Sequence, residues 1–173
     1  RLTEIQAAIA REQLKKLKSL NTQRLELVNL LKKNLHDNPY ISVLTGGDRA
    51  ASSSVHATFY VVPLQFDPST AGVSRAQFVQ ALEAEGLVVG EGYTRPLYLQ
   101  PLYQTRTLHK HGYPWTARPN LRSKPDYSPG ICPVTESLHF KELIVSEHVR
   151  PPHQPADVKD ITEAINKVCG ISQ

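Results

Sequence analysis

A single apolar stripe through the first 35 residues most constrains what this chain can fold into. Its members recur at helical spacing, which predicts an amphipathic helix. They are Ile5, Ala8, Ile9, Leu14, Leu17, Leu20, Leu25, Val28, Leu31 and Leu35. Thr3 and Gln6 have the spacing of a capping box at its start. Because the ring of Pro39 disfavours helical geometry at the preceding residue, we expect a helix over Thr3–Asp37.

Two β-rich runs flank a second predicted helix. The run Ala57–Leu64 is typical of a strand, and Leu87–Val89 is typical of another. Between them, a capping-box sequence followed by periodic apolar residues predicts a helix over Ser74–Glu85, with Gly86 in the position that commonly ends helices. A strand, a helix and a strand in succession predict an α/β layer.

The rest of the chain adds shorter elements. Residues 38–55 are rich in turn formers, and Gly46–Asp48 lacks the lysine and following helix of a phosphate loop, so it indicates a turn. Cys132–Glu136 opens a third helix with proline at its first position. Leu143–Val145 is a candidate third strand of a small sheet. Asp157–Val168 is predicted to be the last amphipathic helix.

The stretch Gly90–Tyr103 directly follows the predicted strand Leu87–Val89. Gly90 and Gly92 free the backbone, and Pro96 and Pro101 oppose a regular helix, so an extended and stiffened path is expected. It carries three tyrosines and one arginine. Segments that leave strand ends often carry ligand-binding groups. The alternative is a proline-rich connection whose tyrosines only cover the core.

Residues Gln104–Ile131 are predicted to form a long irregular segment, and such segments are usually functional. His109 and His111 have no third ligand at suitable spacing, so no metal site is predicted. Trp115 is a candidate to stack on a ligand or another subunit, or to pack in the interior. Cys132 has no recognisable His or Asp partner, which indicates a structural role.

Composition is that of an ordinary globular domain. The chain has 173 residues, 40% hydrophobic and 21% charged, and no apolar run of membrane-spanning length. Its net charge is +4, but basic and acidic residues alternate along most of the chain, which does not favour a nucleic-acid partner. Two cysteines without a CxxC pair indicate a reducing, cytoplasmic setting.

Four segments occur in a fixed order and span essentially the whole chain. They are the opening Arg-Leu-Thr-Glu-Ile-Gln-Ala-Ala, the segment Tyr93–Tyr103, the segment Cys-Pro-Val-Thr-Glu-Ser-Leu-His at 132–139, and the proline-rich approach to the last helix. Together they resemble the DegT/DnrJ/EryC1/StrS sugar aminotransferases. The chain would then begin within the first motif. It also contains no methionine, so we expect it to be the later part of a longer polypeptide; a processed mature chain is the alternative.

The resemblance implies a fold-type-I enzyme dependent on pyridoxal 5′-phosphate. Residues 1–173 would be its single C-terminal small domain, an α/β (α+β) fold with a small sheet packed by helices, preceded by a connecting helix over about 3–37. The large domain, which carries the cofactor lysine, would be absent from this chain. The full-length enzyme would move an amino group from glutamate or glutamine to a keto-sugar or keto-cyclitol, as a cytoplasmic homodimer. No catalytic residue is expected in this chain, and the fragment alone is expected to be inactive.

The same resemblance nominates the site residues. Arg1, beside the start of the first helix, would contact the cofactor phosphate. Tyr93, Arg95 and Tyr98 would line the approach of the substrate to the cofactor. Many nucleotide-sugar members of the family carry histidine at the position of Tyr98, and Thr135 replaces the usual alanine, so the acceptor stays open.

Three alternatives remain. Some family members are dehydratases that use histidine in place of the cofactor lysine. A free-standing binding module, for RNA or a partner protein, would use Tyr103 and Trp115 with Tyr93 and Tyr98 as stacking surfaces beside two arginines. A purely structural half that dimerises is the third.

Overall fold

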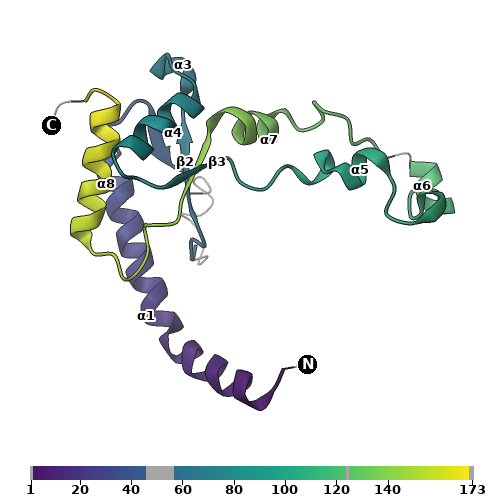
Figure 1. Cartoon of the computed structure of the whole chain (residues 1–173), viewed down its shortest axis with the longest axis horizontal. Coiled ribbons are helices and arrows are strands. Elements are labelled where there is room, and N and C mark those ends of the chain that lie inside the picture. Colours follow the sequence, from purple (N-terminus) through teal and green to yellow (C-terminus); the bar gives the residue numbers. More distant parts are fainter. Residues whose placement is uncertain (1, 46–56, 124, 172–173) are drawn as a thin grey trace.

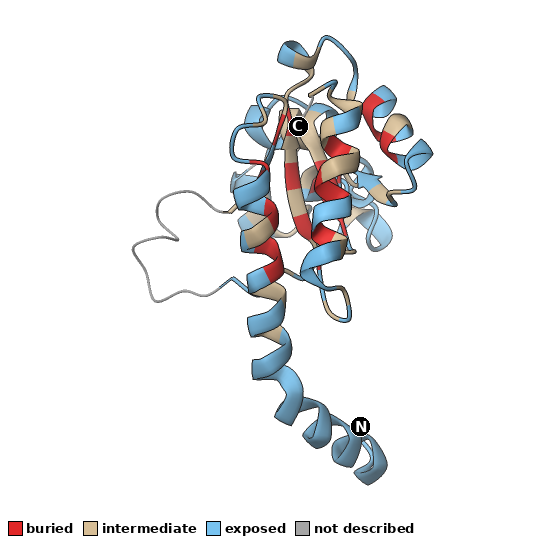
Figure 2. Ribbon diagram, turned by 90° about the vertical axis from the view of Figure 1, so that its left-hand side faces the viewer, coloured by how far each residue is buried: buried red, intermediate tan, exposed pale blue. Residues whose placement is uncertain are grey.

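Helix α1 (Glu4–Asn34) begins as its sequence predicts and ends three residues before the predicted Asp37, with Leu35 as its C-cap. Thr3 is the N-cap, and both hydrogen bonds of its capping box with Gln6 are present. The carboxyl-terminal half of α1 is buried through Leu27, Val28 and Leu31, whereas the amino-terminal half extends into solvent (Figure 2). The apolar stripe therefore continues along the helix beyond the core.

A computed structural model describes residues 2–45, 57–123 and 125–171. Within them, four strands form one antiparallel sheet in the order β1-β2-β4-β3. The strands are β1 (Ile41–Val43), β2 (Val62–Phe66), β3 (Val89–Glu91) and β4 (Leu143–Ser146). Leu64 of β2 lies opposite both Val43 of β1 and Ile144 of β4. The predicted mixed fold with a small sheet is confirmed.

Helices make up most of the rest. The α-helices after α1 are α3 (Pro68–Ala71), α4 (Arg75–Ala84), α5 (Pro101–Thr105), α6 (Arg118–Ser123), α7 (Pro133–Ser137) and α8 (Pro155–Val168). Shorter helical turns are η1 (Leu97–Leu99), η2 (Lys110–Gly112) and η3 (Leu138–Glu142). Ser74 caps α4 through a capping box with Gln77, and Gly86 has the left-handed backbone expected after a helix end.

One core joins one face of the sheet to α1, α4 and α8. Alternate residues of β2 are buried, which is the pattern of a strand with one face in the core. The rings of Phe66 and Phe78 stack there with centroids 4.4 Å apart. From α8, Val158, Ile161 and Ile165 complete the same cluster. These helices thus cover a single face of the sheet, and other segments of the chain leave from the ends of its strands.

Two predicted strands start later than the sequence indicated, for one physical reason. The strand expected over Ala57–Leu64 is β2, from Val62 to Phe66, and the strand expected over Leu87–Val89 is β3, from Val89 to Glu91. Val62 and Val89 both pair with Ser146, the last residue of β4. Residues before Val62 and Val89 lie past the end of β4 and have no partner there.

Strand β1 lies in the connection that the sequence predicted to be only turns. Ile41 and Val43 are buried on either side of exposed Ser42, but three residues are too short a pattern to distinguish from a turn. Gly46–Asp48 lies outside the described residues.

Residues 93–131, here called the projecting arm, leave the sheet after β3 and extend away from the body of the molecule (Figure 1). The arm is less extended than predicted. Pro101 cannot lie inside a helix, but it occupies the first position of α5, where proline is tolerated. The helical turn η1 precedes α5. Short helices also occupy part of Gln104–Ile131, which the sequence predicted to be irregular.

Candidate functional site

The projecting arm leaves the sheet at Gly92, whose conformation only glycine adopts easily. Its φ is +66°, and a Cβ there would lie 2.9 Å from the backbone oxygen of His139. The Gly92 N–H donates to the Leu143 carbonyl at 2.7 Å. Gly90, by contrast, is paired with Val145 inside β3. The freed backbone that the sequence predicted at two glycines is therefore found at Gly92.

Tyr98 is held by the carboxylate of Glu136 in α7, along which the chain returns from the arm. Its hydroxyl donates a hydrogen bond to Glu136 Oε1, which also accepts from the Gly130 N–H at 2.7 Å. Burial and the Glu136 carboxylate raise the pKa of Tyr98 to about 12. The hydrogen bonds from Tyr98 and Gly130 lower the pKa of Glu136. Tyr98 is thus a neutral phenol whose one proton points at Glu136.

The other two predicted substrate residues are accessible. Tyr93 is 54% exposed, and Arg95 is exposed as well. Within the part of the chain that the structure describes, the Arg95 guanidinium forms no ion pair. Tyr93, Arg95 and Tyr98 lie among the first six residues of the arm. The residues lining the two open cavities of about 560 Å³, which flank β1 and β3, include none of the three.

An aromatic cluster stabilises the arm from within. The Tyr103 ring lies 6.1 Å from that of Trp115 and 5.2 Å from that of Tyr127, and Trp115 Nε1 donates to the Tyr127 hydroxyl at 3.2 Å. The Arg106 guanidinium lies 5.7 Å from the centre of the Tyr127 ring. Gln104 Nε2 donates to the carbonyls of Tyr98 and Tyr127 at 2.7 and 2.6 Å. The rings of Tyr103 and Trp115 therefore pack edge to face within the arm.

The net positive charge of the chain lies in this arm. Residues 93–131 contain six of the 20 lysines and arginines and only one of the 16 acidic residues, Asp126. The remainder carries slightly more acidic than basic side chains. The alternation seen along most of the sequence hides this local excess, which an anionic ligand would favour.

His139 and Glu136 are two site residues that sequence reasoning missed. Burial, followed by the nearby charges of Arg75 and Arg95, lowers the pKa of His139, so this imidazole is neutral at pH 7. Glu136 was assigned only a helix-opening role. The contact of Glu136 with Tyr98 spans 38 positions of sequence, and His139 lies against Gly92 at the base of the arm, so no local pattern shows either contact.

The described residues do not build a site for pyridoxal phosphate by themselves. Every lysine among them is exposed, so none is enclosed as a cofactor lysine must be. Arg1, the predicted phosphate contact, lies outside the described residues. Over 2–45, 57–123 and 125–171, no three His, Cys, Asp or Glu side chains gather as metal ligands. Among the same residues, no helix has the length and hydropathy needed to span a membrane.

Known proteins with the same fold and sequence pattern are much longer. A protein of Micromonospora echinospora named as an L-glutamine:3-amino-2,3-dideoxy-scyllo-inosose aminotransferase is 28% identical over 173 residues, which cover 97% of this chain and 39% of that protein. The Helicobacter pylori aminotransferase PseC, involved in pseudoaminic acid biosynthesis, matches in structure with a TM-score of 0.69 and 19% identity, over 98% of this chain and 38% of its own.

A third match is a GDP-4-keto-6-deoxymannose-3-dehydratase with a trapped PLP-glutamate adduct, at TM-score 0.59 and 20% identity, over 94% of this chain and 35% of that one. The chain thus spans about two fifths of the relatives that it matches. The family model of the DegT/DnrJ/EryC1/StrS aminotransferases matches residues 1–166. This match covers nearly the whole chain, and the protein belongs to the DegT/DnrJ/EryC1/StrS aminotransferase family.

Proposed function

We propose that the full-length protein is a pyridoxal-phosphate-dependent aminotransferase that moves an amino group from glutamate or glutamine to a keto-sugar or keto-cyclitol. The observation that carries this proposal is the family match over residues 1–166. In this proposal residues 1–173 are the carboxyl-terminal small domain with its connecting helix. The large domain supplies the cofactor lysine, and the cofactor, when bound, serves as the electron sink.

The role of this chain is to bind and orient the substrate through the arm. Arg95 offers an exposed guanidinium whose planar fork can bind a carboxylate or a phosphate in a bidentate manner. The excess of basic residues on the arm attracts the same anions. The Tyr98 hydroxyl, fixed by Glu136, presents its oxygen lone pairs and ring at a set position toward the sugar. Arg1 is proposed to contact the cofactor phosphate.

The exposed half of α1 supplies a surface for the rest of the enzyme. Ile5 is 76% exposed and Ile9 is 59% exposed, yet both belong to the apolar stripe whose members Val28 and Leu31 are buried in the core. A contiguous exposed apolar stripe indicates an interaction surface. We assign it to contact with the large domain within a homodimer. The two cysteines among the described residues are both free, consistent with a cytoplasmic enzyme.

The test begins with the reading frame upstream of residue 1. It should encode a large α/β domain with a lysine in a family-like cofactor context. The purified full-length protein should then convert glutamate or glutamine to the corresponding 2-oxo acid only when a keto-cyclitol or keto-sugar is present. A start codon close to residue 1, with no such domain, would refute the proposal.

A dehydratase is a second candidate, because a GDP-sugar dehydratase shares the fold. It would carry histidine in place of the upstream lysine and would release water from the sugar without net amino transfer. Mass analysis of the sugar product separates the two, since amino transfer and dehydration change its mass differently.

A nucleic-acid-binding module is a candidate from a different class, favoured by the basic excess of the arm. Oligonucleotide affinity that falls steeply with salt would support it. The aromatic rings of Tyr103 and Trp115 already pack edge to face within the arm, which leaves less free ring surface for bases, and we expect no such binding.

A further inference from the structure

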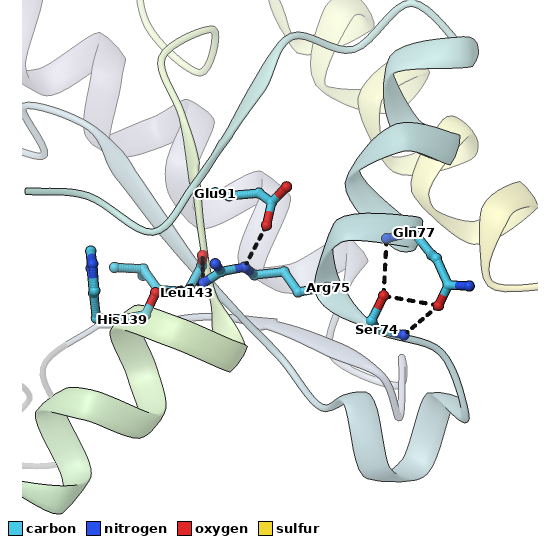
Figure 3. A network of polar contacts seen from close by, with 6 residues as sticks. All are labelled: Ser74, Arg75, Gln77, Glu91, His139 and Leu143. Atoms are coloured by element: carbon cyan, nitrogen blue, oxygen red, sulfur yellow. Dashed lines mark hydrogen bonds and ion pairs between the residues drawn. The ribbon is translucent and has the colours of Figure 1, made fainter. Parts of the chain in front are cut away.

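Arg75 joins the two ends of the projecting arm (Figure 3). It is the first residue of α4, and its side chain is only 10% exposed. Its Nη1 donates to the carbonyl oxygens of His139 at 2.7 Å and Leu143 at 3.1 Å. Its Nε lies 3.3 Å from the Glu91 carboxylate.

These partners lie where the arm departs and where the chain returns. Glu91 is the last residue of β3 and immediately precedes Gly92, where the arm leaves the sheet. His139 and Leu143 follow α7, along which the chain comes back to the sheet. The Leu143 carbonyl accepts from both Arg75 and the Gly92 N–H. One guanidinium therefore fixes the departing and returning segments to each other.

Local helix chemistry does not account for an arginine at this position. The amino end of a helix carries partial positive charge, which disfavours a cation in the first turn. Ser74 already caps α4, and no acidic residue lies in the first turn of this helix to offset Arg75. A lysine cannot reproduce the geometry, because its ammonium is a point charge without the planar fork of a guanidinium. The contacts to the arm explain the residue.

We propose that Arg75 is a positioning residue of the substrate site. It acts through the backbone of His139 and Leu143 and through Glu91, and it sets the direction in which the arm presents Tyr93, Arg95 and Tyr98. This proposal rests on the proposed function for the substrate role of the arm. The role differs from a general stabilising role, because loss of Arg75 should loosen the arm while the sheet and its covering helices keep their packing.

The test is amide hydrogen exchange on full-length Arg75→Gln, which removes the charge and the fork. The Gly92 amide, bonded to the Leu143 carbonyl, and the amides at 136–142 should exchange at least about tenfold faster, the change that corresponds to loss of about 1.4 kcal/mol of local protection. Amides of β2 and α8 should be unchanged. Arg150→Gln is the matched control, because Arg150 pairs only with neighbouring Glu147 at 3.7 Å. Unchanged exchange at the arm, or an equal rise throughout the sheet, overturns the proposal.

Two further variants separate geometry from charge and keep the test informative. Arg75→Lys keeps the charge but not the planar fork, so the rapid exchange at Gly92 should persist in this variant. If Arg75→Gln yields no folded protein, Glu91→Gln replaces it, since Glu91 is 41% exposed and tolerates substitution. Faster exchange confined to Gly92 and residues 136–142 supports the proposal, and protection equal to wild type overturns it.

Kinetics then test the link to the substrate. Arg75→Gln should raise KM for the keto acceptor by about tenfold, a factor equal to about 1.4 kcal/mol, with the cofactor retained as in the wild type. Faster exchange with unchanged KM overturns the link to the substrate site. The exchange measurement needs no activity, so failure of the proposed function and failure of the role of Arg75 are distinguishable.

Discussion

Replacing Gly92 with alanine should displace or unfold the base of the arm. The φ of +66° at Gly92 costs an L-residue about 1–2 kcal/mol. The new Cβ would also lie 2.9 Å from the His139 backbone oxygen and 3.2 Å from its ring Nδ1. Because a backbone atom cannot swing aside as a flexible side chain does, this overlap adds about 1–3 kcal/mol. Alanine stiffens the unfolded chain, which returns about 0.4–1 kcal/mol.

The expected net loss for Gly92→Ala is therefore about 1–5 kcal/mol of unfolding free energy. Gly72→Ala is a matched control, because Gly72 has nearly the same φ, +68°, and nothing within 4 Å of the added Cβ. The control carries the backbone strain without the overlap and should lose about 1 kcal/mol. The difference between the two variants measures the contact with His139.

Urea denaturation followed by circular dichroism gives both values. Hydrogen exchange at residue 92 adds a local reading, since the Gly92 N–H is bonded to the Leu143 carbonyl. Equal losses in the two variants, with the amide at 92 still protected, would show that the approach to His139 does not constrain the arm.

Three further predictions follow from the same geometry. In the full-length enzyme, Arg95→Ala should raise KM for one substrate by about tenfold or more, because it removes a charge-assisted contact of about 1.5–3 kcal/mol. Tyr98→Phe should depress turnover of the acceptor more than turnover of the amino donor. Unchanged kinetics with altered melting temperatures would remove both residues from the site. Because the pKa of Tyr98 is raised from its ordinary 10 to about 12, its contribution to stability is present below pH 10 and is lost as the pH rises toward 12; alkaline denaturation should show this loss in wild type, and Glu136→Gln should reduce it. Residues 1–173 alone should form no stoichiometric single-site adduct with pyridoxal phosphate. They should self-associate through the exposed half of α1, and Ile9→Asp should weaken that association in sedimentation experiments.

Local signals in the sequence determined the longer helices. The capping boxes at Thr3 and Ser74 are formed as predicted, because their hydrogen bonds join residues three apart and need no distant partner. The periodic stripe of α8 predicted its buried face for the same reason. The family resemblance of four ordered motifs was also readable, and the family match over residues 1–166 confirms it.

Strand ends and the site depended on partners that are distant in sequence. Val62 and Val89 begin their strands because Ser146 ends β4, which no local window contains. The glycine requirement at Gly92 arises from the approach of His139.

The predicted site residues illustrate the same division. The proline-stiffened path after a strand and the matching family segment pointed to Tyr93, Arg95 and Tyr98 as a group, and their contact with substrate stays a prediction. Only the tertiary structure determined that Tyr98 donates to Glu136 and that Arg75 joins both ends of the arm. Chain connectivity determines hydrogen bonds between near neighbours, whereas bonds across 38 or 64 positions form only after the whole fold brings their atoms together.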